Sequence, residues 1–224
     1  MLFNAILGGD PKTILVSLLL SLPIVLLSLS VHETAHGFAA YRLGDPTAKS
    51  MGRLTLNPFK HLNPLGFLCM LLFGFGWANP VPINTRYFKN PKRDMALSAL
   101  AGPVSNLLLA VMFALLLRCE YLVVANVGIS SLLSQQIFVF LQEFLVIGIR
   151  LNIVLAVFNL IPCPPLDGSR IFFVFLSPNL YFKVMRYEQY LSIALMIALA
   201  LGLLDEPINF VSNIFLNLIY RLIF

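Results

Sequence analysis

Long uncharged apolar runs, separated by short polar segments, are the main pattern of this chain. The first run covers residues 13–31 and is long enough to cross a hydrocarbon layer of about 30 Å. Helices satisfy their own backbone hydrogen bonds in lipid, so such runs predict an all-α, polytopic membrane protein of about five to six transmembrane segments. The other apolar runs lie at residues 65–77, 95–117, 135–158, 190–204 and 208–222.

The run at residues 65–77 is too short for a perpendicular helix with anchoring ends. Basic residues lie on both sides of it, and the positive-inside rule places both groups in the cytosol. We therefore expect this run to be re-entrant, which leaves five spanning helices, an external N-terminus and a cytosolic C-terminus. The flanking basic residues are Arg42, Lys49, Arg53 and Lys60 before the run, and Arg86, Lys89, Lys92 and Arg93 after it.

Residues 52–56, between the first two runs, alternate between apolar and polar side chains. This pattern predicts a small β element on the cytosolic side. No internal repeat of the kind left by a transporter duplication is evident. At 224 residues, we expect a single membrane-embedded domain over residues 1–224.

Composition agrees with a membrane protein, since 59% of the residues are hydrophobic, 11% are charged and the mean hydropathy is +0.88. The net charge of +5 follows from the basic loops, so we expect the lipid bilayer and no nucleic acid as a partner. Cys69, Cys119 and Cys163 show no CxxC spacing, which argues against a disulfide framework or a thiolate cluster. No small-residue cleavage site is evident, so we expect no removable signal peptide.

The sequence His-Glu-Thr-Ala-His at residues 32–36 continues directly from the first apolar run. Helical residues four apart share a face, so His32 and His36 can hold one metal ion while Glu33 serves as the general base for a water. Two imidazoles leave room for a third protein ligand and a water, which is the open coordination of catalytic zinc. We therefore predict one Zn²⁺ per chain. Chance spacing is disfavoured because ionisable residues in a membrane segment are costly.

Asp167 is the best candidate for the third ligand. It is the next-to-last residue of the segment Asn-Leu-Ile-Pro-Cys-Pro-Pro-Leu-Asp-Gly at residues 159–168, where three prolines prevent helix continuation. Non-helical backbone at membrane depth is tolerated where it is buried or lines a wet cavity, so this segment is expected to face the metal. The alternatives are an ordinary Pro-Pro turn, or Cys163 or His61 as the ligand. Asp45 and Asp94 are instead predicted to be a loop residue and a helix N-terminal residue.

Six sequence blocks in order resemble the site-2 protease family of intramembrane metallopeptidases, peptidase family M50. The resemblance is to the compact members without a PDZ or CBS domain, and it extends over residues 29–171. Two positions depart from the family pattern, since Asn63 stands where an acidic residue is common and Asn79 where a basic one is expected. The blocks cover residues 32–37, 52–58, 61–66, 76–84, 101–106 and 159–168.

The resemblance implies that His32, His36 and Asp167 bind zinc and that Glu33 is the catalytic glutamate. It also implies a catalytic role for Asn159 in holding the substrate carbonyl or its oxyanion, which an amide N–H can do. Asn159 could alternatively cap the end of a broken helix. The block at residues 101–106 is expected to pack near the active-site helix. There Gly102 would serve close packing, and Asn106 would make either a packing hydrogen bond or a substrate contact.

The implied reaction is hydrolysis of a peptide bond in or near a transmembrane segment of a membrane-tethered protein, in regulated intramembrane proteolysis. The expected partner is a membrane-embedded substrate, typically a single-pass regulator. The expected location is the cytoplasmic membrane, with the active site near the cytosolic face. Two other functions stay open: an intramembrane metal or ion transporter, and a catalytically inactive zinc protein that binds membrane segments.

Overall fold

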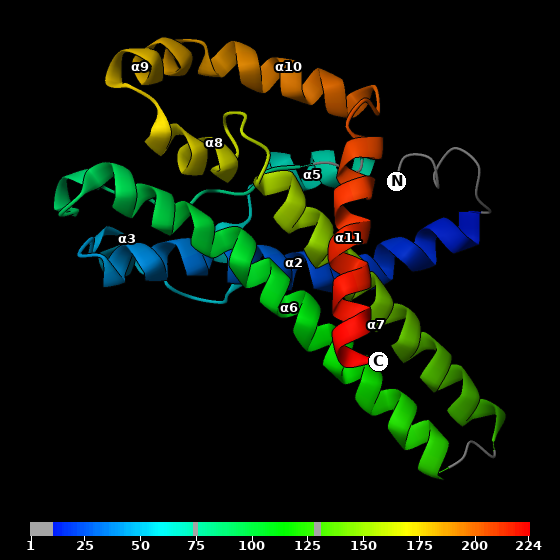
Figure 1. Cartoon of the computed structure of the whole chain (residues 1–224). Helices are drawn as coiled ribbons and strands as arrows, with labels where there is room; N and C mark the ends of the chain where they lie inside the picture. The colour runs from blue at the N-terminus through cyan, green and yellow to red at the C-terminus, as the bar shows by residue number, and fades with distance from the viewer. Residues whose placement is uncertain (1–10, 74–75, 128–130) are drawn as a thin grey trace.

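The computed structural model describes residues 11–73, 76–127 and 131–224. This part of the chain is built from helices joined by short segments (Figure 1), which confirms the all-α prediction. The start of the chain, where no signal peptide is expected, lies outside the described residues. The elements are α2 (Pro11–Arg42), α3 (Thr47–Ser50), α4 (Pro58–His61), α5 (Pro64–Phe73), η1 (Thr85–Tyr87), α6 (Pro91–Val127), α7 (Leu132–Asn159), α8 (Asp167–Phe172), η2 (Phe173–Phe175), α9 (Pro178–Arg186), α10 (Glu188–Ala200) and α11 (Asp205–Ile223).

Three described helices are long and apolar enough to cross a membrane: α2 over Leu19–Arg42, α6 over Pro91–Asn126 and α7. Helices α10 and α11 meet the same criterion only together, as a pair bent by 82°. The described part of the chain thus has three helices that are able to span a membrane, or four if the bent pair is one broken span, which agrees with a multi-pass membrane protein. The predicted count of five spans is not confirmed.

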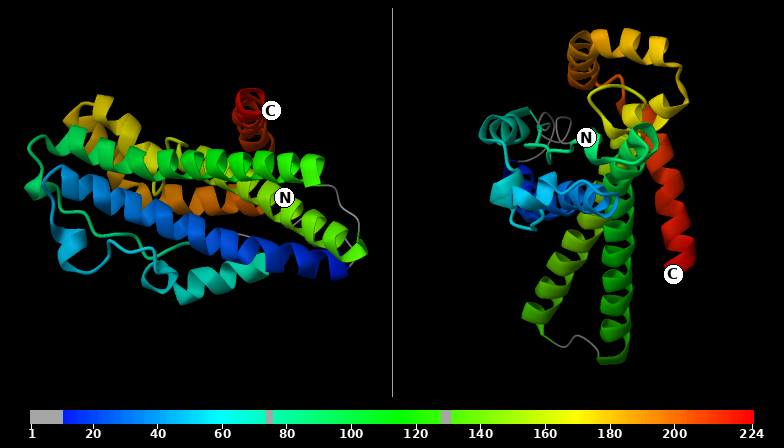
Figure 2. Two further views of the ribbon diagram at one scale, coloured as in Figure 1. Left: turned by 90° about the horizontal axis from the view of Figure 1, so that it is seen from below. Right: turned by 90° about the vertical axis from the view of Figure 1, so that its left-hand side faces the viewer.

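The core lies where α6 packs against both α2 and α7, with α11 against α7 (Figures 1 and 2). Lipid is as apolar as these side chains, so the contacts are stabilised mainly by close packing. Small residues permit that packing: a Cβ on Gly148 of α7 would come within 3.0 Å of the Phe113 ring on α6. Buried core residues are Ile24, Ala110, Phe113, Ala114, Leu117, Leu145, Ile149, Ile153, Val157 and Ile219.

The β element predicted at residues 52–56 is not found, since the described residues contain no strand. This segment is irregular, and its Thr55 carbonyl is held by side chains and not by a partner strand. The Thr55 carbonyl accepts a 2.7 Å hydrogen bond from Thr34 Oγ1 of α2 and another of 2.7 Å from His61 Nε2 of α4. The alternation of apolar and polar residues thus reflects a segment that packs one face on α2. A single sequence does not distinguish this pattern from that of a strand.

The segment at residues 62–79 that contains α5, here called the α5 loop, turns back on itself. Leu62 and Ala78 form an isolated antiparallel bridge, and the Asn79 N–H donates to the His61 carbonyl at 2.7 Å. At the start of α5, Gly66 lies so close to the Trp77 backbone that no Cβ would fit. The two ends of the segment therefore meet, which favours a re-entrant loop over a crossing. Its insertion into the membrane stays a prediction.

Asn63 and Asn79, the two departures from the family pattern, contact each other. Asn63 Nδ2 donates to Asn79 Oδ1 at 3.0 Å, and Asn63 Oδ1 accepts from the Gly66 N–H at 2.9 Å. Asn79 Nδ2 in turn donates to the Leu62 carbonyl at 3.0 Å. A neutral amide pair thus joins the ends of the loop where an ion pair would otherwise be expected.

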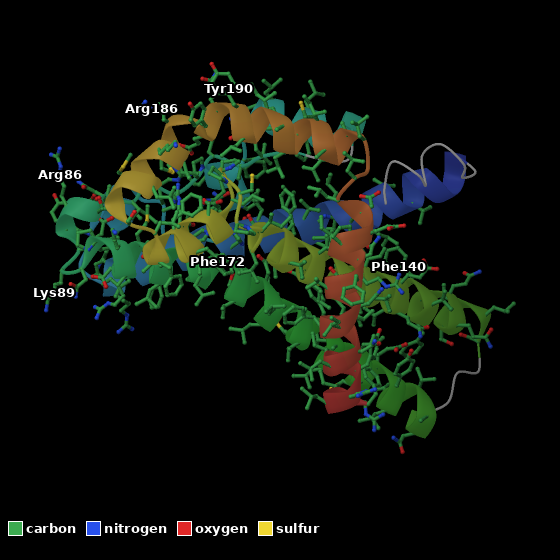
Figure 3. The ribbon with its side chains drawn as sticks, turned by 45° about the horizontal axis from the view of Figure 1, so that its top comes forward. Arg86, Lys89, Phe140, Phe172, Arg186 and Tyr190 are labelled. Atoms are coloured by element: carbon green, nitrogen blue, oxygen red, sulfur yellow. The ribbon has the colours of Figure 1, made fainter. Side chains whose placement is uncertain are left out.

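Basic side chains gather at the end of the molecule where α2 ends and α6 begins. Figure 3 shows Arg86 and Lys89 projecting from this end, with Arg186 of α9 on the same side and Phe140 of α7 far from them. Asn84, just before η1, is tied to the end of α2 by a 2.7 Å hydrogen bond from its N–H to Asp45 Oδ2. This grouping agrees with the positive-inside pattern of the sequence.

Candidate metal centre

Helix α2 continues without a break from its apolar half through His32, Glu33 and His36 to Arg42. The two histidines and the glutamate are each 8% exposed. The four-residue spacing places both imidazoles on one face, where their Nε2 atoms lie 2.9 Å apart. The helical periodicity predicted from the sequence thus brings two metal-binding nitrogens together.

Asp167 reaches the two histidines because the chain reverses after α7. Helix α7 ends at Asn159, the proline-rich segment 160–166 follows, and Asp167 is the first residue of α8. Gly168 makes the reversal tight, since a Cβ there would strike the carbonyls of Leu160 and Ile161. Asp167 Oδ2 consequently lies 3.2 Å from the Nε2 atoms of both histidines, and its side chain is 13% exposed.

The other nitrogen of each imidazole faces an acceptor. His32 Nδ1 lies 2.6 Å from Asn106 Oδ1, and His36 Nδ1 lies 2.8 Å from the Ser98 carbonyl. Both partners belong to α6. If each Nδ1 carries the proton, each Nε2 presents a lone pair towards Asp167. This is the arrangement expected of histidines that bind a metal, whose second nitrogen is usually hydrogen-bonded.

Three electron-pair donors therefore converge on one point. Asp167 Oδ2 has no hydrogen-bond donor, although it is buried. Two lone-pair nitrogens and a carboxylate oxygen at 2.9–3.2 Å repel one another unless a cation lies between them. Tetrahedral zinc with bonds of about 2.0–2.1 Å places its ligands about 3.3 Å apart, close to the separations here. The donor set thus fits Zn²⁺.

The surroundings of the Asp167 carboxyl favour its ionised form. Burial raises the pKa of Asp167, but in the absence of a metal ion, hydrogen bonds and charge from protonated His32 and His36 imidazoles outweigh burial and hold that pKa below its ordinary value. An ionised carboxylate is the form that binds metal.

Gly102 of α6 leaves room for the ligands. A Cβ at this position would lie within 3.0 Å of ring atoms of both His32 and His36. The sequence led us to expect a role in close packing for Gly102. The structure refines that expectation, because the partners are the two imidazoles themselves.

Glu33 is held by the backbone of a distant segment. Its Oε2 atom accepts a 2.8 Å hydrogen bond from the N–H of Val81, which follows the α5 loop. Val81 and Leu54 also pack so tightly on Gly37 of α2 that a side chain at Gly37 would displace them. Sequence reasoning missed the contact with Val81, because a backbone N–H has the same chemistry in nearly every residue.

The two alternative ligands do not join the group, which among the described residues contains His32, His36 and Asp167. His61 is buried and donates to the Thr55 carbonyl. Cys163 Sγ lies 3.4 Å from the Pro164 carbonyl, and burial raises the pKa of its thiol, which disfavours the thiolate that zinc binds.

Three other polar residues named from the sequence make hydrogen bonds to backbone groups. Asn159 is the last residue of α7 and is half-buried, and its Nδ2 donates to the Leu155 carbonyl at 2.9 Å. Asp45 accepts from the N–H of Thr47 at 2.9 Å in the loop after α2. Asp94 Oδ2 accepts from the Asn90 N–H at 3.0 Å at the start of α6. Asp45 and Asp94 thus lie where the sequence predicted them.

Comparison with known proteins gives the family. The model described as "Peptidase family M50" matches residues 21–204, which include all three metal-site residues. The chain belongs to peptidase family M50. The resemblance to site-2 proteases is therefore confirmed, and the M50 membership together with the His32, His36 and Asp167 group assigns Zn²⁺ as the cofactor.

Named relatives agree with this assignment. The chain is 45% identical over 168 residues to "Putative zinc metalloprotease YwhC" of Bacillus subtilis (strain 168), which covers 74% of this chain and 73% of that protein. It is 34% identical over 149 residues to "Putative zinc metalloprotease Rip2" of Mycolicibacterium smegmatis, and 31% identical to the Rip2 protein of Mycobacterium tuberculosis H37Rv. Each of these two matches covers 64% of this chain and about half (52%) of the relative. No solved structure matches.

Proposed function

We propose that this M50 protein is a zinc-dependent intramembrane endopeptidase that hydrolyses peptide bonds in or near transmembrane segments of membrane-tethered proteins. The observation that carries the proposal is the convergence of His32, His36 and Asp167 on a point beside α6, one of the membrane-crossing helices. A metal site on a long apolar helix is suited to a peptide that is already in the membrane, and this favours a membrane-embedded substrate over a soluble one.

His32, His36 and Asp167 would hold the metal, and Glu33 would act as the base. When bound, Zn²⁺ polarises the scissile carbonyl and lowers the pKa of a water. Glu33 takes the proton of the attacking water and passes it to the leaving amine. The Val81 N–H, which donates to one Glu33 oxygen, leaves the other free for this proton. Asn159 would hold the substrate carbonyl or its oxyanion after its amide turns from the Leu155 carbonyl.

The site is proposed to lie near the cytosolic face of the cytoplasmic membrane. His36 and His32 precede Arg42 by six and ten residues, or about 9 and 15 Å along the helix. Arg42 belongs to the basic end of the molecule, which the positive-inside rule assigns to the cytosol. A single-pass regulator whose transmembrane helix unwinds near that face is the substrate we propose, because intact helical backbone hides its peptide bonds.

The central experiment compares purified wild type with Glu33→Gln and Asp167→Ala. We expect wild type to bind zinc and cleave a membrane-tethered test substrate. Glu33→Gln should bind zinc without cleavage, because only the base is lost. Asp167→Ala should lose most bound zinc, because one of three protein ligands is missing. Zinc content by elemental analysis and cleavage by gel shift are the measurements.

Glu143→Gln is the matched control, since Glu143 is an exposed carboxylate on α7 that is outside the ligand group. It should keep both zinc and cleavage. Zinc uptake into vesicles by Glu33→Gln would support a transporter instead. Full zinc with no cleavage by wild type would support an inactive zinc protein, and full zinc in Asp167→Ala would overturn the site.

A further inference from the structure

A chain of buried amides links the metal site to the contact between α6 and α7. Asn106 of α6 and Asn152 of α7 are both 0% exposed. Asn106 Oδ1 lies 2.6 Å from His32 Nδ1, and Asn106 Nδ2 donates to Asn152 Oδ1 at 2.9 Å. Asn152 Nδ2 donates to the Gly148 carbonyl at 2.9 Å. The chain thus crosses three helices, from α2 to α7.

The far end of this chain determines the direction of every hydrogen bond in it. The Gly148 carbonyl can only accept, so the Nδ2 end of Asn152 must face it. The Oδ1 atom of Asn152 then faces Asn106, so Asn106 must donate a hydrogen bond to it through Nδ2. Asn106 therefore presents Oδ1 to His32, and His32 Nδ1 must donate. The remaining nitrogen of His32, Nε2, keeps its lone pair, and it is the atom that faces Asp167.

We propose that Asn106 and Asn152 are positioning residues that hold His32 in the tautomer and ring orientation needed to bind zinc. This inference rests on the proposed metal site. Of the two roles that the sequence left open for Asn106, a substrate contact is disfavoured because the side chain is fully buried and engaged at both ends. Its hydrogen bonds extend to a metal ligand and are not confined to the packing of two helices.

The apolar surroundings of Asn106 and Asn152 explain why both amides are fully hydrogen-bonded. Asn152 lies on the buried face of α7 beside Ile149 and Ile153, which belong to the apolar core. An amide in such a place is destabilising unless it is fully hydrogen-bonded. The second ligand needs no such chain, because His36 Nδ1 faces the Ser98 backbone carbonyl. Side-chain substitution can therefore weaken the support of His32 but leaves the acceptor of His36 in place.

The test measures zinc affinity of the purified protein by chelator competition, in wild type, Asn106→Leu, Asn152→Leu and the double variant. Leucine is close to asparagine in size and cannot accept from His32. We expect a 10–100-fold weaker affinity for Asn106→Leu, as for other partners of metal-bound histidines. Asn152→Leu should weaken it less. The double variant should match Asn106→Leu, because Asn152 acts only through Asn106.

Two further variants separate positioning from packing. Leu109→Ala removes buried volume from α6 within a turn of Asn106, so it should lower the melting temperature and keep wild-type zinc affinity. Asn106→Asp restores an acceptor for His32 and should bind zinc more tightly than Asn106→Leu. Wild-type affinity in Asn106→Leu, additive losses in the double variant, or an equal loss in Leu109→Ala would each overturn the inference. Absence of zinc from wild type would instead overturn the proposed site.

Discussion

Gly102 and Gly148 face similar steric limits in different surroundings. Gly102 lies against the imidazoles of His32 and His36, whereas Gly148 lies against the Phe113 ring in the α6–α7 contact. Both positions are helical, where alanine would otherwise be favoured over glycine by about 1 kcal/mol. The close contacts show that space, and not backbone conformation, selects glycine at both sites.

Gly102→Ala is therefore expected to displace the two imidazoles and to weaken zinc binding at least about ten-fold, the lower end of losses for disturbed metal ligands. Overpacking should also cost about 1–3 kcal/mol of stability, which exceeds the gain in helix propensity. Zinc content and melting temperature are the measurements. Gly148→Ala is the control, since it should lower the melting temperature and keep its zinc. Normal zinc affinity in Gly102→Ala would show that the rings adjust freely.

At the scale of elements, the sequence predicted those features that depend on periodicity and on proline. The spacing of His32 and His36 and the helix end before Asp167 follow from helical geometry and from prolines, and both are found in the structure. The strand predicted at residues 52–56 is not found in the structure. The Thr55 carbonyl there accepts hydrogen bonds from side chains of α2 and α4 in place of a partner strand. Contacts of this tertiary kind leave no pattern in a single sequence.

The α5 loop gives the testable prediction at the scale of elements. Because its two ends meet, Lys60 and Lys89, which flank it and are exposed, should lie on the same side of the membrane. Cysteines placed at these two positions, one at a time in a variant with Cys69, Cys119 and Cys163 replaced by alanine, should react with an impermeant thiol reagent from the cytosolic side only. Labelling from opposite sides would show that α5 crosses the membrane.

At the scale of the whole molecule, the metal site joins parts that are far apart in the sequence. Its ligands come from α2 and α8, its supporting acceptors from α6, and the amide chain continues into α7. The backbone partners, the Ser98 carbonyl and the Val81 N–H, were beyond sequence reasoning because backbone groups are alike in every residue. A bound metal would thus tie four helices together, which makes stability depend on it.

Removal of zinc should consequently lower the melting temperature of the purified protein. A ligand that binds only the folded state stabilises it by about 2.7 kcal/mol when its free concentration is 100 times Kd. Chelation abolishes this contribution and leaves the three donor atoms repelling one another at 2.9–3.2 Å. Asp167→Ala, which lacks a ligand, should melt at nearly the same temperature with and without chelator. An equal response of wild type and Asp167→Ala to chelator would mean that the stabilising metal binds elsewhere.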